Sequence, residues 1–344
     1  MSQSAGSVCI PVSQVAIKKP RLAFVGVGWI GFSRMKALAD SGNAEIRAIV
    51  EPQEDPARRA RQLAPDAEIL ADFTEALESD VDGIVIATPS ALHAEQATLA
   101  LREGLAVFCQ KPLGRNHTET KRAIDAARAS DRLLKVDLCY RFVAAAAKIR
   151  ELIQTGGLGD VFALDLAFHN AYGPDKSWFY DPNLSGGGCL IDLGIHLVDL
   201  ALWLLDFPAV ENVNGTLFTN GRKFARDGDE VEDFATATIR LAPHIDVNVA
   251  CSWRAHAGQD AVIEAAVYGT KGGARLHNVN GSFYDFAAEH YTGTSRQVLI
   301  EPPDGWGGRA VLDWLAHLTR SNRFDPDIEN LGTVASVLDR IYES

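Results

Sequence analysis

The strongest constraint on the fold is the alternation of short apolar runs with helical patterns across residues 21–143. The runs are rich in β-branched residues and cover residues 22–27, 46–50, 83–87, 105–109 and 133–138. Helical patterns, such as those over 91–103 and 118–129, separate them. Strands that are almost continuously apolar and separated by helices are typical of a parallel sheet covered on both faces. The sequence therefore predicts an α/β, doubly wound domain over 21–143, preceded by a loose extension over 1–20.

The second half of the chain has a different period. Apolar side chains recur at every second position at Val231, Ala235, Ala237, Ile239 and Leu241, with Glu232, Thr236, Thr238 and Arg240 between them. The same alternation runs through Ile245, Val247, Val249, Cys251 and Trp253. Such alternation indicates antiparallel strands with one covered face. With helical patterns over 190–205, 310–320 and 331–342, it predicts an α+β domain with a mostly antiparallel sheet over 144–344. The helical segment 144–154 fits either domain.

Composition narrows the partners. The 344 residues carry 45 acidic against 33 basic side chains, a net charge of −12, which argues against a nucleic acid or an anionic membrane as partner. A small neutral ligand fits better. The five cysteines stand alone, without the spacing of a zinc site, as expected of reduced thiols in a cytosol. The first 20 residues lack the continuous apolar core of a signal peptide. We therefore expect a cytoplasmic protein without a bound metal.

Three glycines follow the first apolar run in the segment RLAFVGVGWIGF, where a helical pattern begins. In a dinucleotide site, the first glycine (Gly26) permits the turn and the second (Gly28) lets the backbone approach the pyrophosphate. The third (Gly31) lets helix and strand pack closely. The alternative is a turn that only reverses the chain, but the strand before, the helix after and Glu51 beyond favour the nucleotide site.

Glu51 ends the second apolar run, 20 residues after the last of these glycines. A carboxylate there accepts hydrogen bonds from both ribose hydroxyls and repels a 2′-phosphate, so it favours NAD. Two alternatives stay open: Glu51 as a solvated strand end, and NADP, because Arg58 and Arg59 lie nearby.

Two further segments lie at strand ends, where ligands bind in open α/β sheets. In ATPSALH, Thr88 and Pro89 are expected to line the path of the cofactor, while Ser90 is expected to be the helix N-cap. In VFCQKPLG, Lys111 follows Gln110 and precedes Pro112, which disfavours helical geometry at the lysine. Alone, Lys111 is a solvated strand-end lysine; together with the glycines it indicates a site.

A polar stripe marks the segment SGGGCLIDLGIHLVDLALWLL. Asp192, His196 and Asp199 stand at i, i+4 and i+7, on one face of an otherwise apolar helix. Buried acids need partners, so a histidine satisfied by an acid is the structural alternative. A third ligand for a metal is absent nearby, whereas a carboxylate that orients a histidine suits general acid/base chemistry. The three glycines at 186–188 either admit a ligand or form a flexible entry loop.

These motifs, GVGWIG, ATPSALH, QKP, YRF and GGGCLIDLGIH in this order, resemble those of the Gfo/Idh/MocA oxidoreductases, which include inositol and sugar dehydrogenases. The resemblance runs from Arg21 to the C-terminus. It implies a Rossmann domain, an α+β domain whose large open sheet forms homodimers or homotetramers, and a substrate held between the domains. It also implies that the cofactor meets Gly26, Gly28, Gly31, Glu51, Thr88, Pro89 and Lys111. We add their neighbours Trp29, Ile30, Ser90, His93 and Gln110 to the predicted cofactor site.

The resemblance assigns roles by motif. Lys111 matches the catalytic lysine, Asp192 the acid of the dyad and His196 the residue that transfers the proton. Arg141 and Trp178 are predicted to join these three in binding the substrate, with weaker candidates at Tyr140, Asp175 and Asp181. One departure stands beside the lysine, where Gln110 replaces the usual glutamate. We expect Gln110→Glu to keep the fold and to shift the pH dependence of turnover.

The predicted reaction is reversible hydride transfer between NAD(P) and a secondary alcohol of a sugar or cyclitol. His196 takes the hydroxyl proton, Asp192 fixes the tautomer of His196, and Lys111 stabilises the developing charge on oxygen. Two enzymatic alternatives are a biosynthetic keto-sugar reductase and an NAD-dependent glycoside hydrolase. A non-catalytic sensor of nucleotide or sugar is the third, which the retained lysine, aspartate and histidine disfavour.

Overall fold

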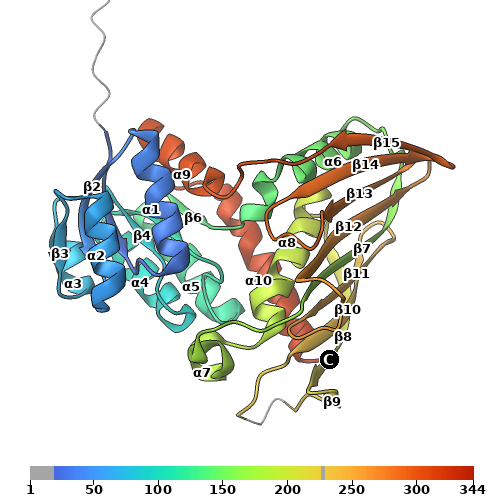
Figure 1. Cartoon of the computed structure of the whole chain (residues 1–344), viewed down its shortest axis with the longest axis horizontal. Coiled ribbons are helices and arrows are strands. Elements are labelled where there is room, and N and C mark those ends of the chain that lie inside the picture. The colour runs from blue at the N-terminus through green and yellow to red at the C-terminus, as the bar shows by residue number, and fades with distance from the viewer. Residues whose placement is uncertain (1–18, 226–228) are drawn as a thin grey trace, which may run out of the picture.

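The computed structural model describes residues 19–225 and 229–344. Most of the predicted extension 1–20, including Cys9, therefore lies outside the described residues. A smaller sheet with helices on both sides occupies one end of the molecule and a large sheet the other, with helices between them (Figure 1).

The first sheet has six parallel strands in the order β3-β2-β1-β4-β5-β6. This is the doubly wound order of dinucleotide-binding domains and confirms the predicted fold class. The strands are β1 (Arg21–Val25), β2 (Glu45–Val50), β3 (Glu68–Leu70), β4 (Gly83–Ile86), β5 (Ala106–Cys109) and β6 (Leu134–Val136). The sequence prediction missed β3, a three-residue edge strand.

Helices connect these strands and cover both faces of the sheet (Figure 1). They are α1 (Trp29–Ser41), α2 (Glu54–Leu63), α3 (Phe73–Glu78), α4 (Ser90–Arg102) and α5 (His117–Ser130). A helix from the far end of the chain, α9 (Arg309–Arg320), completes one layer. Its Trp314 is fully buried against Phe108 of β5, with ring centroids 5.8 Å apart. The sequence prediction assigned this helix to the α+β domain, whereas the structure packs it on the first sheet. The division into 21–143 and 144–344 as domains stays a prediction.

The second sheet has nine strands in the order β15-β14-β13-β12-β7-β11-β10-β8-β9, antiparallel except for the parallel pair β7 and β11. The strands are β7 (Val161–Asn170), β8 (Val210–Thr219), β9 (Arg222–Lys223), β10 (Phe234–Leu241), β11 (Ile245–Ser252), β12 (Ala261–Gly269), β13 (Gly273–Asn278), β14 (Phe286–Thr292) and β15 (Ser295–Ile300).

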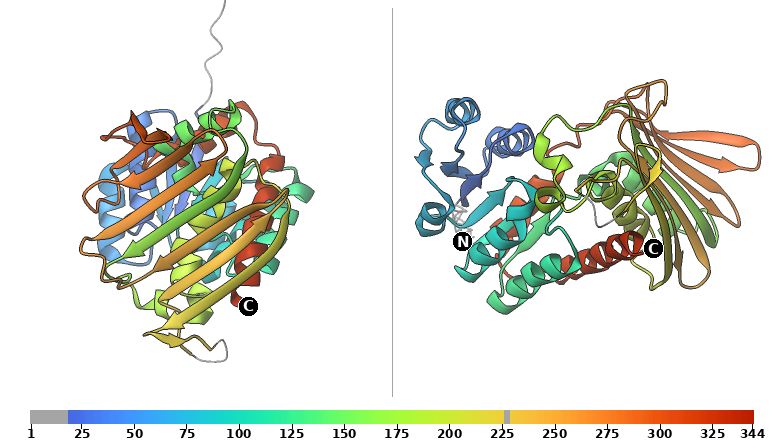
Figure 2. Two further views of the ribbon diagram at one scale, coloured as in Figure 1. Left: turned by 90° about the vertical axis from the view of Figure 1, so that its right-hand side faces the viewer. Right: turned by 90° about the horizontal axis from the view of Figure 1, so that it is seen from below.

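Helices cover one face of this sheet, and Figure 2 shows the other face uncovered. The covering helices are α6 (Ala144–Gln154), α8 (Ile195–Leu204) and α10 (Asn330–Tyr342). The apolar rows predicted in β10 and β11 are buried on the covered side. One member of the predicted polar row breaks the pattern: Glu232 precedes β10 and is fully buried. The alternation fails there because the residue lies outside the regular strand.

Short helical turns complete the described chain. They are η1 (Cys139–Phe142), η2 (Ser177–Tyr180), α7 (Pro182–Ser185), the π-helical turn η3 (Leu190–Gly194) and η4 (Pro326–Glu329). By length and composition the stretch Pro182–Leu204 could cross a membrane, but 89% of its apolar window is buried inside the protein. It serves as a core helix, which accounts for its apolarity.

Candidate active site

The glycine loop between β1 and α1 has the geometry of a phosphate cradle. Gly26 has a φ of +84°, and a Cβ there would lie 2.6 Å from the carbonyl oxygen of Ala87. A Cβ at Gly31 would lie 2.3 Å from the carbonyl oxygen of Gly26, so loop and helix touch. Above Gly28 nothing lies within 4 Å of such an atom, which leaves room for a ligand.

The start of α1 leaves its amide groups for that ligand. The first residue, Trp29, is 74% exposed, and Ile30 beside it is half-buried. The helix has no side-chain cap and no acidic residue in its first turn. Free N–H groups at a helix N-terminus bind phosphate. The loop thus fits the pyrophosphate of a dinucleotide.

Glu51 stands directly after β2, beside the glycine loop. Its Oε2 accepts a hydrogen bond of 2.9 Å from the main-chain N–H of Val27, and its Oε1 accepts one of 3.0 Å from that of Gln53. Each carboxylate oxygen has further lone pairs for ribose hydroxyls. Of the two nearby arginines, Arg58 pairs with Asp55 and Arg59 lies over the ring of Phe32.

The second predicted loop, after β4, is tied to the lysine loop by His93. Its Nε2 lies 2.7 Å from the carbonyl oxygen of Thr88, and its Nδ1 lies 2.7 Å from that of Pro112. The ring is 2% exposed, so it joins two loops and offers little surface to a cofactor. Burial lowers the pKa of His93, against the two carbonyl contacts, which favour the protonated ring. Its predicted cofactor contact stays a prediction.

Ser90 was expected to cap α4, and this is wrong. The helix begins at Ser90 itself, with Pro89 in the N-cap position and no side-chain cap. Proline fits there because its extended backbone leads into the helix and it needs no hydrogen-bond acceptor. Ser90 is buried.

Lys111 reaches from the end of β5 to the π-helical turn of the second domain. Its Nζ donates to Oδ1 of Asp192 at 2.6 Å and to the main-chain oxygen of Asp192 at 2.7 Å. The other carboxylate oxygen accepts a hydrogen bond of 3.2 Å from Nε1 of Trp253. The two side chains are 19% and 13% exposed, so the pair is partly shielded. The structure thus brings together two residues that lie 81 positions apart in the chain.

His196 lies close to this pair but is not hydrogen-bonded to Asp192 in the described part of the chain. The prediction that Asp192 orients His196 is therefore wrong, because the carboxylate is taken by Lys111 and Trp253. The imidazole packs against Tyr140, with ring centroids 4.8 Å apart, and its Nδ1 is buried without a hydrogen-bond partner. Burial, followed by the charges of Lys111 and Arg34, lowers the pKa of His196 well below its usual value. The ring is neutral at physiological pH.

The side-chain amide of Gln110 has a partner other than the lysine. Its Nε2 donates to Oδ2 of Asp137 at 2.5 Å, and the same oxygen accepts from Nε of Arg34 at 2.6 Å. All three side chains are buried. The sequence reasoning missed Asp137 and Arg34, although an acid directly after β6, at the same edge as Lys111, was a usable signal.

The third acid of the stripe has a partner of its own. Asp199 is 2% exposed, and its Oδ2 accepts a hydrogen bond of 2.8 Å from Nε of Arg141, whose guanidinium also lies over the ring of Phe207. Arg141 therefore neutralises a buried acid. Its predicted contact with substrate stays a prediction.

The segment with Trp178 approaches the site through a neighbour. Trp178 stacks on Phe179 with ring centroids 3.8 Å apart, and Phe179 and Tyr180 pack against Trp253. Of the weaker candidates, Asp181 caps α7, and Asp175 is exposed beside Lys176. Trp253, which appeared in the sequence only as the end of an apolar row, is the residue that joins this segment to Asp192.

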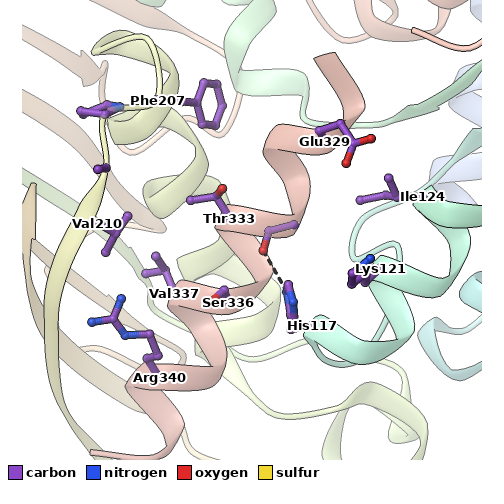
Figure 3. Close-up of a pocket in the computed structure, with 13 residues that line it drawn as sticks. His117, Lys121, Ile124, Phe207, Val210, Glu329, Thr333, Ser336, Val337 and Arg340 are labelled. Atoms are coloured by element: carbon purple, nitrogen blue, oxygen red, sulfur yellow. Dashed lines mark hydrogen bonds between the residues drawn. The ribbon is translucent and has the colours of Figure 1, made fainter. Parts of the chain in front are cut away.

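A separate cavity of about 500 Å³ lies between α5, α10 and the loop after α8 (Figure 3). His117 and Lys121 line it from α5, and Thr333 and Arg340 from α10. Lys121 is paired with Asp125. None of the predicted site residues lines this cavity. In the described ranges 19–225 and 229–344, no group of three or more His, Cys, Asp or Glu side chains is placed to hold a metal ion.

Family models match most of the chain. Residues 20–138 match the oxidoreductase family with an NAD-binding Rossmann fold, and residues 146–275 match the GFO/IDH/MocA C-terminal domain. The chain belongs to the Gfo/Idh/MocA family. It is therefore an NAD(P)-dependent oxidoreductase, with the fold class and cofactor expected from its motifs.

Named relatives agree with this membership. The chain is 30% identical to a putative UDP-kanosamine synthase oxidoreductase subunit of Amycolatopsis mediterranei, with 74% of each chain covered. It is 25% identical to the D-glucoside 3-dehydrogenase of Escherichia coli, over 81% of this chain and 80% of the relative. Among solved structures, levoglucosan dehydrogenase in complex with NADH and levoglucosan has the same fold, with a TM-score of 0.82, 21% identity, and 95% and 97% coverage.

Proposed function

We propose that this Gfo/Idh/MocA oxidoreductase transfers a hydride reversibly between NAD(H) and a secondary alcohol or ketone of a sugar or cyclitol. One observation carries the proposal: Lys111 is held 2.6 Å from Asp192 beside the neutral His196, at the sheet edge that follows the nucleotide loop. The D-glucoside 3-dehydrogenase among the relatives supports a sugar as the substrate class.

The cofactor site in this proposal consists of the glycine loop and Glu51. Open space above Gly28 and the uncapped start of α1 favour a bound pyrophosphate. Glu51 accepts hydrogen bonds from the ribose hydroxyls. When bound, the nicotinamide supplies the hydride donor or acceptor. The protein orients the substrate carbon and manages one proton.

His196 is the proposed base for alcohol oxidation. Its depressed pKa keeps the ring neutral, which a base requires. Because Nδ1 is buried without a partner, Nε2 is the nitrogen left to meet a hydroxyl group. For Nε2 to accept a proton, the hydrogen of the neutral ring must reside on Nδ1. The carboxylate of Asp192 does not fix this tautomer, so the apolar packing against Tyr140 must hold the ring.

Lys111 is the proposed donor to the reacting oxygen. An ammonium group has three N–H donors, and Asp192 takes two of them with its side-chain and main-chain oxygens. The third is left for the substrate oxygen, where it stabilises charge as the proton leaves. Asp192 thereby acts on Lys111, which it orients and neutralises.

The test is a screen of sugars, cyclitols and their keto forms with NAD(H) and NADP(H), followed by nicotinamide absorbance. With the substrate found, Lys111→Ala and His196→Ala should each lower kcat by about 10²-fold. Matched controls are Lys121→Ala and His317→Ala, which remove the same side chains far from the site. Near-normal kcat in both site variants would refute the assignment.

The same screen separates the alternative reactions. A dehydrogenase accumulates NADH and a ketone reductase consumes it, whereas a hydrolase turns over with only a catalytic amount of tightly held NAD. Binding of NAD without hydride exchange on any compound would favour a sensor.

We further propose that the protein is a cytoplasmic homodimer or homotetramer that assembles through the uncovered face of the nine-stranded sheet. Phe162 and Tyr268 on the neighbouring strands β7 and β12 are 52% and 41% exposed, and two aromatic side chains on adjacent strands favour an interface there. The described cysteines are unpaired, in keeping with a reducing compartment. Light scattering tests this proposal: we expect an oligomeric wild type and a shift of Tyr268→Glu towards the monomer. A monomeric wild type would contradict the proposal.

A further inference from the structure

Glu232 is a buried carboxylate that the proposed mechanism does not use. It is 0% exposed and lies just before β10, where the sequence pattern had placed it on the solvent side. Among residues 19–225 and 229–344, no Lys or Arg forms an ion pair with it. A buried carboxylate without a cation needs several hydrogen-bond donors, and most of those around Glu232 belong to one segment.

These donors belong to the glycine loop at the start of the helical stretch 190–204, which carries Asp192 and His196 and is called the catalytic helix below. The main-chain N–H of Gly188 lies 2.9 Å from both carboxylate oxygens of Glu232, and that of Leu190 donates to Oε1 at 2.8 Å. The N–H between them, of Cys189, donates to the main-chain oxygen of Glu232 at 3.0 Å. Three successive amides at the start of the helical stretch 190–204 therefore end on one residue. Burial raises the pKa of Glu232, and the hydrogen bonds from the amides of Leu190 and Gly188 oppose this rise by stabilising the ionised carboxylate.

A tyrosine from the last helix completes the arrangement. The hydroxyl of Tyr342 in α10 donates to Oε1 of Glu232 at 2.9 Å. The glycines fit this pair closely, since a Cβ at Gly188 would lie 1.9 Å from the main-chain oxygen of Glu232. A Cβ at Gly187 would lie 2.0 Å from the hydroxyl of Tyr342. The glycines thus let Glu232 and Tyr342 pack directly against the backbone of this loop.

The contact of Glu232 with this loop lies one helical turn from the reacting groups. Leu190, held by Glu232, is two residues before Asp192, and the N–H of Asp192 donates to the carbonyl oxygen of Gly188 at 3.1 Å. Lys111 is held by both the side chain and the main chain of Asp192. A shift of the loop would therefore move both anchors of the lysine at once.

We propose that Glu232 and Tyr342 are positioning residues, which fix the start of the catalytic helix and thereby the place of Lys111 and Asp192. The proposal rests on the proposed function, because it assumes that Lys111 and Asp192 belong to the reaction machinery. It connects the C-terminal helix α10 to the active site through two contacts: Tyr342 with Glu232, and Glu232 with the loop before Asp192.

The test compares two Tyr-to-Phe variants. Tyr342→Phe removes one hydroxyl and keeps the ring beside Gly187. Its matched control is Tyr291→Phe, which removes a hydroxyl that donates to the buried Glu289 at the far edge of the sheet. We expect kcat to fall about 10-fold in Tyr342→Phe, with the Kd for NADH within about 2-fold, and to stay unchanged in the control. Glu232→Gln should lower kcat further, since a neutral amide presents an N–H to main-chain donors.

A readout independent of turnover follows amide hydrogen exchange in the peptide that contains 186–192. Exchange should speed up in both Tyr342→Phe and Glu232→Gln and stay as in wild type in Tyr291→Phe. The positioning role would be refuted if Tyr342→Phe kept the wild-type kcat although its amide exchange was faster and its Tm loss matched that of the control. Should Glu232→Gln fail to fold, Tyr342→Phe still decides. If the wild type itself transfers no hydride to any compound, the proposed function fails instead. Amide exchange alone then shows whether Glu232 and Tyr342 hold the loop 186–192.

Discussion

Gln110→Glu is the substitution for which the structure changes the expectation most. The amide of Gln110 donates to Oδ2 of Asp137 at 2.5 Å, and Arg34 is the cation that shares this oxygen. A glutamate at position 110 has no hydrogen to donate when ionised. Two carboxylates would then meet in a buried space with one guanidinium between them.

The size of the effect follows from two competing costs. At 2.5 Å and an effective dielectric constant near 20, two unit charges repel by about 7 kcal/mol. Keeping a proton on the new glutamic acid at pH 7 costs about 4 kcal/mol, because its ordinary pKa is near 4.3. Protonation is cheaper, so the folded variant keeps one proton between the two carboxyls. The pKa of the new side chain is thus raised in the folded chain, and stability falls as the pH rises above about 4.3.

The assay is denaturant unfolding at pH 5 and pH 8. Relative to wild type, we expect the stability deficit of Gln110→Glu to grow by about 4 kcal/mol between these values. Gln110→Met removes the hydrogen bond without adding a charge, so its deficit should be the same at both. The exchange Gln110→Glu with Asp137→Asn should restore a pH-independent stability, because the asparagine amide donates to the new carboxylate. A stability deficit of Gln110→Glu that is equal at both pH values would refute this reasoning. If the pH profile of turnover shifted while the deficit stayed equal, residue 110 would act on Lys111 instead.

Three further outcomes are expected. Gly31→Ala places a methyl group 2.3 Å from the carbonyl oxygen of Gly26, so it should weaken NAD binding at least about 10-fold by calorimetry, and unchanged affinity would contradict the cradle. Arg141→Ala leaves the carboxylate of Asp199 buried and unpaired, and should cost about 3 kcal/mol in denaturant unfolding, an effect that a role confined to substrate would not produce. The pKa of His196 is lowered by burial, so the unfolded chain binds its proton first and stability is lost as pH falls below 6.5. His196→Phe should flatten the fall of Tm between pH 7.5 and 5.5, and an unchanged slope would show that another group causes it.

The fold was largely predictable because its signals are local. Continuous apolar runs and alternating rows each indicate which faces of a strand are covered. They predicted five of the six strands of the first sheet and the pair β10 and β11 of the second. The misses are elements whose pattern carries no such report. The three residues of β3 include Ile69, which is 37% exposed at the sheet edge. Helix α9 has one apolar face like any surface helix, and that face does not say which sheet it will cover.

The structure brings together Lys111 and Asp192, which the sequence had singled out, but their pairing was not predictable. Spacing along a helix placed Asp192 and His196 on one face, yet the partner of Asp192 comes from a strand end 81 residues earlier. Likewise, Gln110 sits next to Lys111 in the chain and bonds to Asp137 instead. Neighbouring residues at a strand end point in different directions, so adjacency in sequence says little about contact. Long-range partners depend on how the two domains pack, which no local period encodes.

The pairings bear on the charge state of His196. Burial, followed by the charges of Lys111 and Arg34, lowers the pKa of His196, and each of these cations is paired with its own acid. The ring is thereby kept neutral while the ion pairs add no net charge to the site. A neutral polyol gains hydrogen-bond donors and acceptors there without having to match an excess charge. An anionic substrate would have to compete with Asp192 for Lys111, so this ion pair disfavours such a substrate by charge.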